Sequence, residues 1–371
     1  MTIPDPTGTL EPSAVDDHLA QLPNTDAVFV VWAGERSAYL AKTSMLRRRL
    51  GRILRPAGET HGRSLNVRGV FTRIDFWLTQ SRFESMLIHY VLAKEYFPEQ
   101  YLKLTRLRLP SYVRLVLSNP FPRTQITTRL TGGKSLYYGP FRTRAAAEQF
   151  DSQLLDLFQL RRCQEDLEPR PEHPGCIYGE MNMCLRPCQE AVSVEEYRSE
   201  ADRVAHFLET GGASALAGAE SARNRLSEEM NFEEAARQHK RIERIEALLA
   251  LREDLVRDIK KLFALVIIRS AEPEAVKLWL CCAGTWQTVI DFALTSDVSL
   301  DRRLRDLMAG MQPEQARIQD REEHLALLAR WAYSSWRDGE LLVFDGLEQA
   351  PYRKIVRAIS RVHAHTQLPL S

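Results

Sequence analysis

The 371-residue sequence lacks any apolar run that approaches the roughly 18 residues needed to cross a membrane. Its first 17 residues are polar, acidic and proline-rich, without the basic start and apolar stretch of a secretory signal. These absences argue against a membrane protein and an exported protein. They predict a cytoplasmic location and no membrane partner.

Cysteine is also scarce, with six residues in the whole chain. Cys281 and Cys282 are adjacent in an apolar run, which predicts a role in core packing. The other four gather between positions 163 and 188. In a chain without an export signal, such a cluster indicates a metal site rather than a set of disulfides.

The spacing of these four cysteines leaves the type of metal site open. Four thiolates can converge on a tetrahedral zinc ion or on a [4Fe–4S] cluster. Only Cys184 and Cys188 are closely spaced, and the wider gaps before them suit the larger cluster better. Four unliganded thiols are the remaining alternative. The thiols concerned are Cys163, Cys176, Cys184 and Cys188.

Acidic residues are few in the first half of the chain. Residues 1–162 contain 23 Lys and Arg against 14 Asp and Glu, whereas the remainder contains 27 against 35. Between Arg36 and Arg144 the balance is 21 basic residues to 5 acidic ones. A basic region joined to an acidic one suggests a polyanionic partner for the basic region. A solvated arginine-rich surface is the alternative.

Hydrophobic periodicity predicts a small α+β domain near the N-terminus. Residues 1–23 are expected to form a disordered lead-in. The domain itself, residues 24–103, has the order β-β-α-β-α. Its expected elements are strands at 27–32 and 37–42, a helix over 43–54 capped by Thr43 or Ser44, a strand within 67–79, and a helix over 81–97 that Ser81 caps and Pro98 ends.

The remaining chain divides by composition into four further regions. No internal repeat is evident. We expect a β/α connector over residues 104–160, a four-cysteine segment over 161–192, a helical region over 193–261, and a small α+β region of unknown role over 262–371.

The first domain resembles the GIY-YIG endonuclease domain that begins UvrC proteins. The resemblance lies in AVFVV, AYLAKTSMLRRRL and ESMLIHYVLAKEYFPEQY. In that family a tyrosine hydroxyl orients the attacking water, an arginine steadies the phosphate, and a glutamate holds one divalent cation. The positions that match are Tyr39, Lys42 and Arg49.

Other motif positions differ from the family pattern. Phe29 replaces the first tyrosine, Ala27 and Ala41 replace glycines, and Leu102 replaces an asparagine. His89 stands where the metal-binding glutamate is expected. A neutral imidazole is a poor ligand for Mg²⁺, so the resemblance implies a degenerate nuclease with vestigial catalytic residues. Mg²⁺ or Mn²⁺ would be bound only if activity remained.

Basic residues near the second strand are the candidate contact to double-stranded DNA. Phosphate contact needs only well-placed cations, whether or not cleavage survives. A solvated helix face is the alternative. The candidate residues are Lys42, Arg47, Arg48, Arg49, Arg52 and Arg55.

The connector and the cysteine segment also resemble UvrC proteins. The connector is similar in YVRLVLSNPFPRTQITTRL and YYGPFRTRAAAEQF, and the cysteine segment in LFQLRRCQEDLEPRPEHPGCIYGEMNMCLRPCQE. Tyr137, Tyr138 and Phe141 could stack on bases, but a core role is favoured. The family's cysteine region is associated with a [4Fe–4S] cluster, so the resemblance favours iron–sulfur, with structural zinc as the alternative.

Residues 221–253 resemble the UVR motif through which UvrC binds UvrB. Physically the segment predicts a helical hairpin with Met230 and Phe232 at its bend and an apolar stripe beyond. Such a hairpin can pair with a like hairpin of a UvrB-like partner, or form an intramolecular coiled coil. The candidate partner-binding residues are Asn231, Phe232, Glu233, Ala235, Ala236, Ile242 and Ile245.

The expected fold class is therefore α+β, with a GIY-YIG-like sheet domain, a cysteine connector, a UVR hairpin and a small C-terminal α+β region. The resemblance implies a nucleotide-excision repair protein that binds DNA and a UvrB-like partner with little or no nuclease activity. Two other functions stay open. One is an active structure-specific endonuclease that uses His89, and the other is an iron–sulfur scaffold that competes for UvrB.

Overall fold

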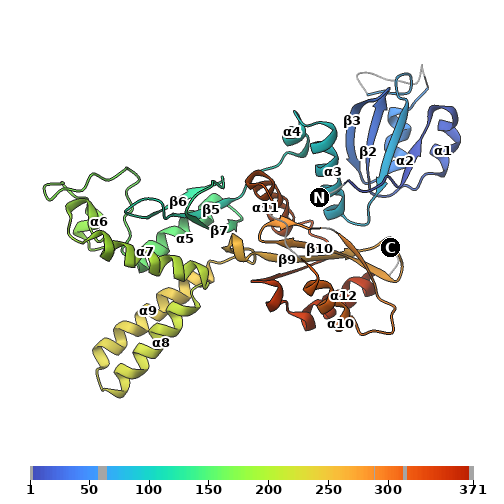
Figure 1. Cartoon of the computed structure of the whole chain (residues 1–371). Coiled ribbons are helices and arrows are strands. Elements are labelled where there is room, and N and C mark those ends of the chain that lie inside the picture. Colours follow the sequence, from blue (N-terminus) through green and yellow to red (C-terminus); the bar gives the residue numbers. More distant parts are fainter. Residues whose placement is uncertain (1–2, 57–64, 288, 312–315, 367–371) are drawn as a thin grey trace.

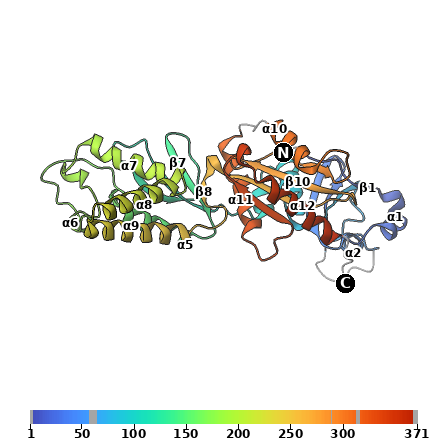
Figure 2. The same ribbon diagram turned by 90° about the horizontal axis from the view of Figure 1, so that it is seen from below.

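Three antiparallel sheets, each covered by helices, organise the described part of the chain. The computed structural model describes residues 3–56, 65–287, 289–311 and 316–366 (Figure 1). The first sheet and the last lie on one side of the molecule, and the middle sheet lies on the other (Figures 1 and 2). No helix among the described residues is both long enough and apolar enough to cross a membrane.

The first sheet has the strand order β1-β4-β2-β3. All six residues from Ala27 to Trp32 are buried, because this central strand is covered on both faces. Helices α1 and α2 cover one face, and α3 covers the other. The elements are β1 (Gly8–Leu10), α1 (Val15–Gln21), β2 (Ala27–Ala33), β3 (Arg36–Thr43), α2 (Leu46–Ile53) and β4 (Arg73–Leu78).

The disorder predicted for residues 1–23 is wrong for most of this segment. Strand β1 pairs with β4, with Gly8 opposite Phe76, and α1 follows it. Leu10 and Val15 are buried apolar anchors in an otherwise polar stretch. The polar composition of the segment did not predict this order. Two buried apolar residues are enough to hold it, because the edge of β4 is available for β1 to pair with.

The cap predicted for α2 is also corrected. The N-cap is Met45 rather than Thr43 or Ser44. Thr43 Oγ1 instead accepts a hydrogen bond from the Met45 N–H at 3.1 Å. The segment before β2 satisfies the first helical amides: the Arg48 N–H donates to Asn24 Oδ1 at 3.1 Å. Tertiary contact therefore replaces the local cap that the sequence suggested.

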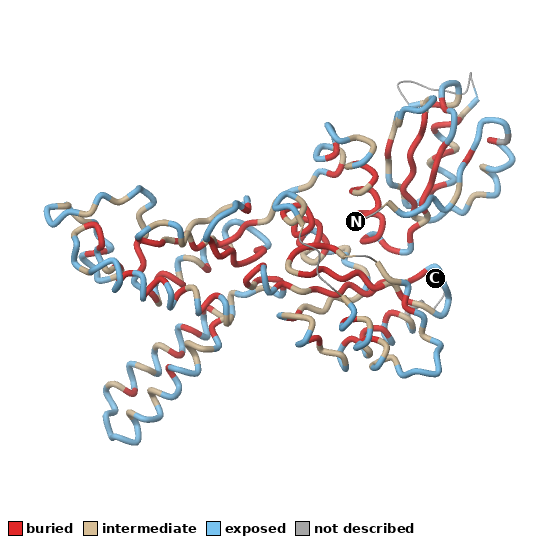
Figure 3. Tube along the Cα trace, viewed as in Figure 1, coloured by how far each residue is buried: buried red, intermediate tan, exposed pale blue. Residues whose placement is uncertain are grey.

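Helix α3 (Arg82–Tyr96) joins the first and last sheets. Ser81 caps it by accepting the Glu84 N–H at 3.0 Å, and the helix ends just before Pro98, as predicted. Ten of its residues are buried, so it has no solvent-facing stripe of the usual width (Figure 3). Its faces pack on β2, β9, β10 and α11, and the short α4 (Tyr101–Thr105) follows.

The middle sheet has the order β6-β5-β7-β8 and is covered by α5. Tyr137, Tyr138 and Phe141 are buried, which confirms their predicted core role. Tyr138 stacks on Phe150 of α5, with ring centroids 5.1 Å apart. The elements are β5 (Ser111–Val116), β6 (Arg123–Thr127), β7 (Ser135–Phe141), α5 (Arg144–Leu157) and β8 (Arg257–Asp258).

Two long helices project from this middle unit as a hairpin (Figure 1). They follow α7, whose N-terminus has a capping box of Ser193 and Glu196. The break between α7 and α8 falls at Gly211 and Gly212, both with positive φ. The helices are α6 (Ile177–Glu180), α7 (Val194–Glu209), α8 (Ala213–Glu228) and α9 (Phe232–Ala250).

The last sheet has β9 and β10 at its centre, with α10 and α12 on one face and α3 and α11 on the other. Cys281 and Cys282 are buried, as predicted. The elements are β9 (Phe263–Arg269), β10 (Ala275–Cys282), β11 (Thr285–Trp286), β12 (Ile290–Ala293), α10 (Leu300–Ala309), α11 (Ile318–Ala332), β13 (Glu340–Phe344) and α12 (Tyr352–Thr366).

Candidate functional site

The nuclease-like positions on β3 point to two different faces of the first sheet. Tyr39 pairs with Val31 of β2, and Lys42 pairs with Val28. Because side chains alternate along a strand, positions three apart lie on opposite faces. Tyr39 packs with the core under α2, where its ring lies 6.0 Å from that of Phe29. Lys42 lies on the α3 face.

Arg49, on α2, contacts Tyr39. Its Nη2 donates a hydrogen bond to Tyr39 Oη at 2.8 Å. The guanidinium is therefore turned toward the sheet rather than toward solvent. The Tyr39 hydroxyl therefore accepts a hydrogen bond from a cation, and Phe29 beside it has no hydroxyl to contribute.

His89 lies on the other face, in α3, close to Lys42. Its side chain is buried, with 9% of the residue exposed. Burial, together with the charges of Lys42 and Arg330, lowers the pKa of His89 to about 4. The imidazole is therefore neutral near pH 7, and the neighbouring cations oppose a divalent metal ion there. Tyr39 and Arg49 thus lie on one face of the sheet, and Lys42 and His89 lie on the other, with the edge strand β3 between the two pairs.

Three of the predicted DNA-contacting arginines are exposed on α2, and we call Arg47, Arg48 and Arg52 the α2 arginine patch. Arg49 is engaged with Tyr39, and Arg55 is half-buried. Within the described residues, no carboxylate forms an ion pair with any member of the patch. Their charges are therefore available to an external anion.

The four cysteines of the middle unit, here called the thiol cluster, differ in exposure. Cys184 and Cys188 are buried, Cys163 is half-buried and Cys176 is exposed. The Arg186 N–H donates to Cys184 Sγ at 3.4 Å, and Arg161 Nη1 donates to Cys163 Sγ at 3.6 Å. Donors of this kind stabilise thiolates that serve as metal ligands.

The thiols of the cluster are close enough to influence one another. Burial raises the pKa of Cys184 to about 11; the Arg186 N–H opposes this rise, and the charges of the other three cysteines add to it. Yet among the described residues no group of three or more His, Cys, Asp or Glu side chains could hold a metal ion. Charges of the thiols can affect one another's pKa at distances well beyond a metal–sulfur bond of about 2.3 Å, so the pKa shift of Cys184 does not require the four sulfur atoms to lie at ligand distance from one centre.

Some of the motif residues of the hairpin are buried and others are exposed. Ala235, Ile242 and Ile245 are buried, and the two isoleucines pack in the middle core. Phe232 is 67% exposed and Met230 is 77% exposed. We call these two residues the hairpin tip. Asn231, Glu233 and Ala236 are exposed beside it.

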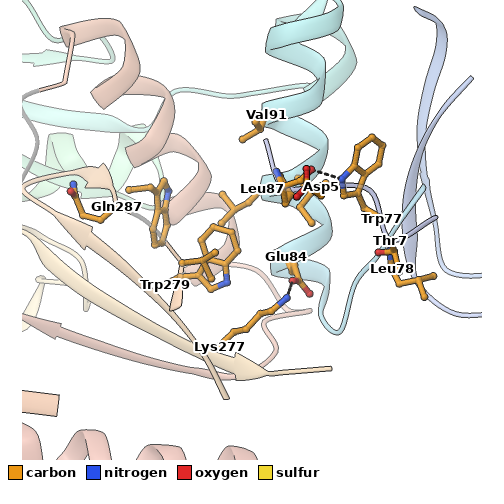
Figure 4. Close-up of a pocket in the computed structure, with 14 residues that line it drawn as sticks. Asp5, Thr7, Trp77, Leu78, Glu84, Leu87, Val91, Lys277, Trp279 and Gln287 are labelled. Carbon is orange, nitrogen blue, oxygen red and sulfur yellow. Dashed lines mark hydrogen bonds and ion pairs between the residues drawn. The ribbon is translucent and has the colours of Figure 1, made fainter. Parts of the chain in front are cut away.

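The packing of α3 against the last sheet includes polar groups that sequence reasoning missed. Figure 4 shows Glu84 of α3 and Lys277 of β10 as an ion pair in a cavity of 290 Å³. Trp77 and Trp279 also line this cavity. Deeper in the contact, Glu323 accepts a hydrogen bond from Tyr101 Oη at 2.6 Å. Acidic residues inside an apolar helical pattern were the only sequence signal for these contacts.

Comparison with known proteins matches the middle unit to one family. The UvrC/Cho excinuclease middle domain matches residues 111–207, which contain the thiol cluster but end before the hairpin. The protein is similar to UvrABC system protein C of Moorella thermoacetica, with 23% identity over 328 residues, or 85% of this chain and 53% of the relative.

Two further relatives carry the same description. UvrABC system protein C of Syntrophus aciditrophicus is 30% identical over 176 residues, which are 47% of this chain and 28% of that protein. The Trichlorobacter lovleyi protein is 27% identical over 225 residues, which are 60% of this chain and 36% of that protein. No solved structure matches the chain significantly.

The chain spans about half the length of the Moorella relative and less of the other two. The matched region nevertheless includes the connector, α5, the thiol cluster and most of α7. Residues 111–207 are therefore similar to the middle domain of the UvrC/Cho excinucleases, and the chain is UvrC-like.

Proposed function

We propose that this UvrC-like chain acts in nucleotide-excision repair, where it binds double-stranded DNA and a UvrB-like partner and cuts DNA little or not at all. The relatives are named as component C of the UvrABC system, a name that implies a B component. The hairpin helices begin at Ala213, just after the matched middle domain ends at residue 207.

The observation that carries this proposal is the exposed hairpin tip. Phe232 and Met230 are large apolar side chains that the folded chain leaves in solvent. Burial of one such side chain contributes about 1.5–3 kcal/mol, so two side by side offer a partner a strong anchor. Ala235, Ile242 and Ile245 hold the hairpin together from inside, so they would position the tip rather than touch the partner.

DNA binding is supported by the α2 arginine patch. Arg47, Arg48 and Arg52 project from successive turns of one helix into solvent. Guanidinium groups without carboxylate partners gain most from phosphate contact, because no intramolecular ion pair must first be broken.

Weak or absent cleavage is supported by the division of the nuclease-like positions. Tyr39 and Arg49 form one pair, and Lys42 and His89 lie on the opposite face. A phosphodiester at either face meets only half of the residues that the chemistry requires. The neutral His89 offers no negative charge with which to hold Mg²⁺.

The thiol cluster would hold a [4Fe–4S] cluster, with structural zinc as the alternative. The fit rests on the donor set, which is all sulfur and has N–H donors directed at Cys163 and Cys184. When bound, such a centre would cross-link the irregular segment between α5 and α7. Cys176 is exposed and directly precedes the short α6, so it would move most on binding.

The test is equilibrium binding to a purified UvrB-like protein. We expect Phe232→Ala and Met230→Ala each to weaken binding about tenfold, because each removes an apolar anchor. Val70→Ala, an equally exposed apolar residue far from the hairpin, is the matched control and should leave Kd unchanged. Equal affinities of wild type, tip variants and control would overturn the proposal.

A further inference from the structure

A crevice of 380 Å³ opens between the first sheet and the last, within the size range of about 300–1,000 Å³ usual for ligand sites. Lys42 enters it from β3, Arg82 from the start of α3, and Arg330 from the C-terminal part of α11. The remaining lining residues among those described are Asp26, Thr43, Ser44, Ser85 and Trp336.

The lining of this cationic crevice is unbalanced in charge. It contains three cations and one carboxylate, Asp26, whose pKa burial raises and the charge of Arg82 lowers. Lys42 lies close enough to Arg330 for the charge of Arg330 to act on it. No described carboxylate forms an ion pair with either of them, although Arg330 Nη1 is oriented by the Thr105 carbonyl oxygen at 2.8 Å.

Burial and neighbouring cations affect the pKa of both Lys42 and Arg330. Desolvation and the charge of Arg330 lower the pKa of Lys42. Desolvation and the charges of Arg108 and Arg106 lower the pKa of Arg330. Like charges held together in this way cost free energy that a bound anion would recover.

The position of the crevice adds a second argument. His89, at the altered metal-ligand position, feels both Lys42 and Arg330. In the nucleases that this domain resembles, a carboxylate would hold a divalent cation that supplies positive charge to a phosphate, whereas this chain places an ammonium and a guanidinium beside a neutral imidazole. Hydroxyl groups of Thr43, Ser44 and Ser85 provide further contacts of the kind that phosphates accept.

We infer that the cationic crevice binds a phosphate oxyanion without a metal ion, with Lys42 and Arg330 as its main donors. Arg330 belongs to the C-terminal region, so that region completes a site begun by β3. The phosphate comes either from a DNA backbone or from a free polyphosphate. Only the DNA source rests on the proposed function.

The DNA arm of the test measures anisotropy of a labelled duplex in EDTA over a range of salt concentrations. We expect Arg330→Gln and Lys42→Gln each to weaken binding about fivefold to tenfold and to reduce the salt slope by about one phosphate contact. Arg353→Gln, an exposed arginine on α12, is the matched control and should bind like wild type.

The second arm uses inorganic tripolyphosphate and follows the thermal unfolding midpoint. A rise in Tm for wild type that is lost in both Arg330→Gln and Lys42→Gln supports the crevice whatever happens with DNA. Two variants are used because Lys42 is exposed and its replacement should leave the fold intact, as circular dichroism would verify.

The outcomes separate this inference from the proposed function. Loss of duplex binding only in Arg47→Gln/Arg48→Gln, with no effect of the crevice variants in either arm, overturns the inference and leaves DNA binding in place. Absence of duplex binding by wild type sinks the DNA part of the proposed function. In that case an Arg330-dependent tripolyphosphate shift still supports the crevice and assigns it to a free polyphosphate.

Discussion

The N-terminal sheet domain and the middle unit both resemble parts of UvrC proteins, but they differ in what became of their motif residues. In the N-terminal domain, the family resemblance places Phe29 and His89 at the positions of reactive groups, and α3 is buried between two sheets. In the middle unit all four cysteines are present, and the adjoining hairpin keeps Phe232 exposed. The N-terminal domain packs around these positions, whereas the middle unit leaves Phe232 in solvent and directs N–H donors at Cys163 and Cys184.

This difference shows how packing can be used to judge a motif. A side chain such as Glu84 or Glu323 that is fully engaged inside the molecule serves the fold. Burial of an exposed apolar residue such as Phe232 by a partner is favourable. The exposed side chain of Phe232, rather than any engaged residue, is therefore the feature that supports partner binding.

The largest effect that sharpens this comparison concerns the thiol cluster. Wild-type protein purified without oxygen should show broad visible absorbance with iron and sulfide, and Cys184→Ala should lose them, because a missing ligand opens the centre. Cys282→Ala is the matched control, since this cysteine is buried in β10. One equivalent of zinc in colourless protein would decide for zinc, and protein with neither metal would refute the site.

A second comparison concerns two phenylalanines with opposite surroundings. Phe83 of α3 is fully buried against Trp279, Trp286 and Trp331. Phe83→Ala should lower the free energy of unfolding by about 3–5 kcal/mol, as expected for a buried aromatic. Phe232→Ala should change it by no more than about 0.5 kcal/mol. Urea unfolding followed by tryptophan fluorescence measures both, and similar losses would contradict the proposed division.

A smaller effect follows from two buried histidines. Burial is the main cause that lowers the pKa of His89 and of His324 to about 4. The unfolded chain binds protons below about pH 6.5, where the folded chain does not. Stability is therefore complete above pH 6.5 and is lost as the pH falls toward 4.

We expect a loss on the order of 1–3 kcal/mol between pH 7 and pH 5, with part of it removed by His89→Gln. Protonation of His324 would also break the hydrogen bond that its Nδ1 accepts from the Trp286 N–H at 3.2 Å. Urea titrations at the two pH values measure the change. A pH slope in His89→Gln equal to that of wild type would show that His89 does not contribute.

Much of the fold follows from local pattern. The β-rich run AVFVVW and the helical spacing over 81–97 predicted β2 and α3 closely, because the first is continuously apolar and the second is long and periodic. The hairpin bend at Met230 was predictable for the same reason. Strand β1 and the α2 cap were not, since both depend on partners supplied by the tertiary structure.

The candidate sites were predictable only in part. Spacing identified the four cysteines, and motif resemblance identified Tyr39, Lys42, Arg49 and His89. The strand register places Tyr39 and Lys42 on opposite faces of the sheet, which a residue-by-residue comparison of motifs does not reveal. Arg330 lies 288 positions after Lys42 in the sequence, yet both line the crevice. Nothing in the sequence around Arg330 indicates a role there.

The central claim is that the chain retains binding and has lost cleavage, and an incision assay tests it most directly. Damaged duplex would be incubated with the protein and a UvrB-like partner in Mg²⁺ or Mn²⁺, and strands separated on a denaturing gel. The account predicts intact strands with either metal. Metal-dependent nicking that disappears in Tyr39→Phe would contradict it.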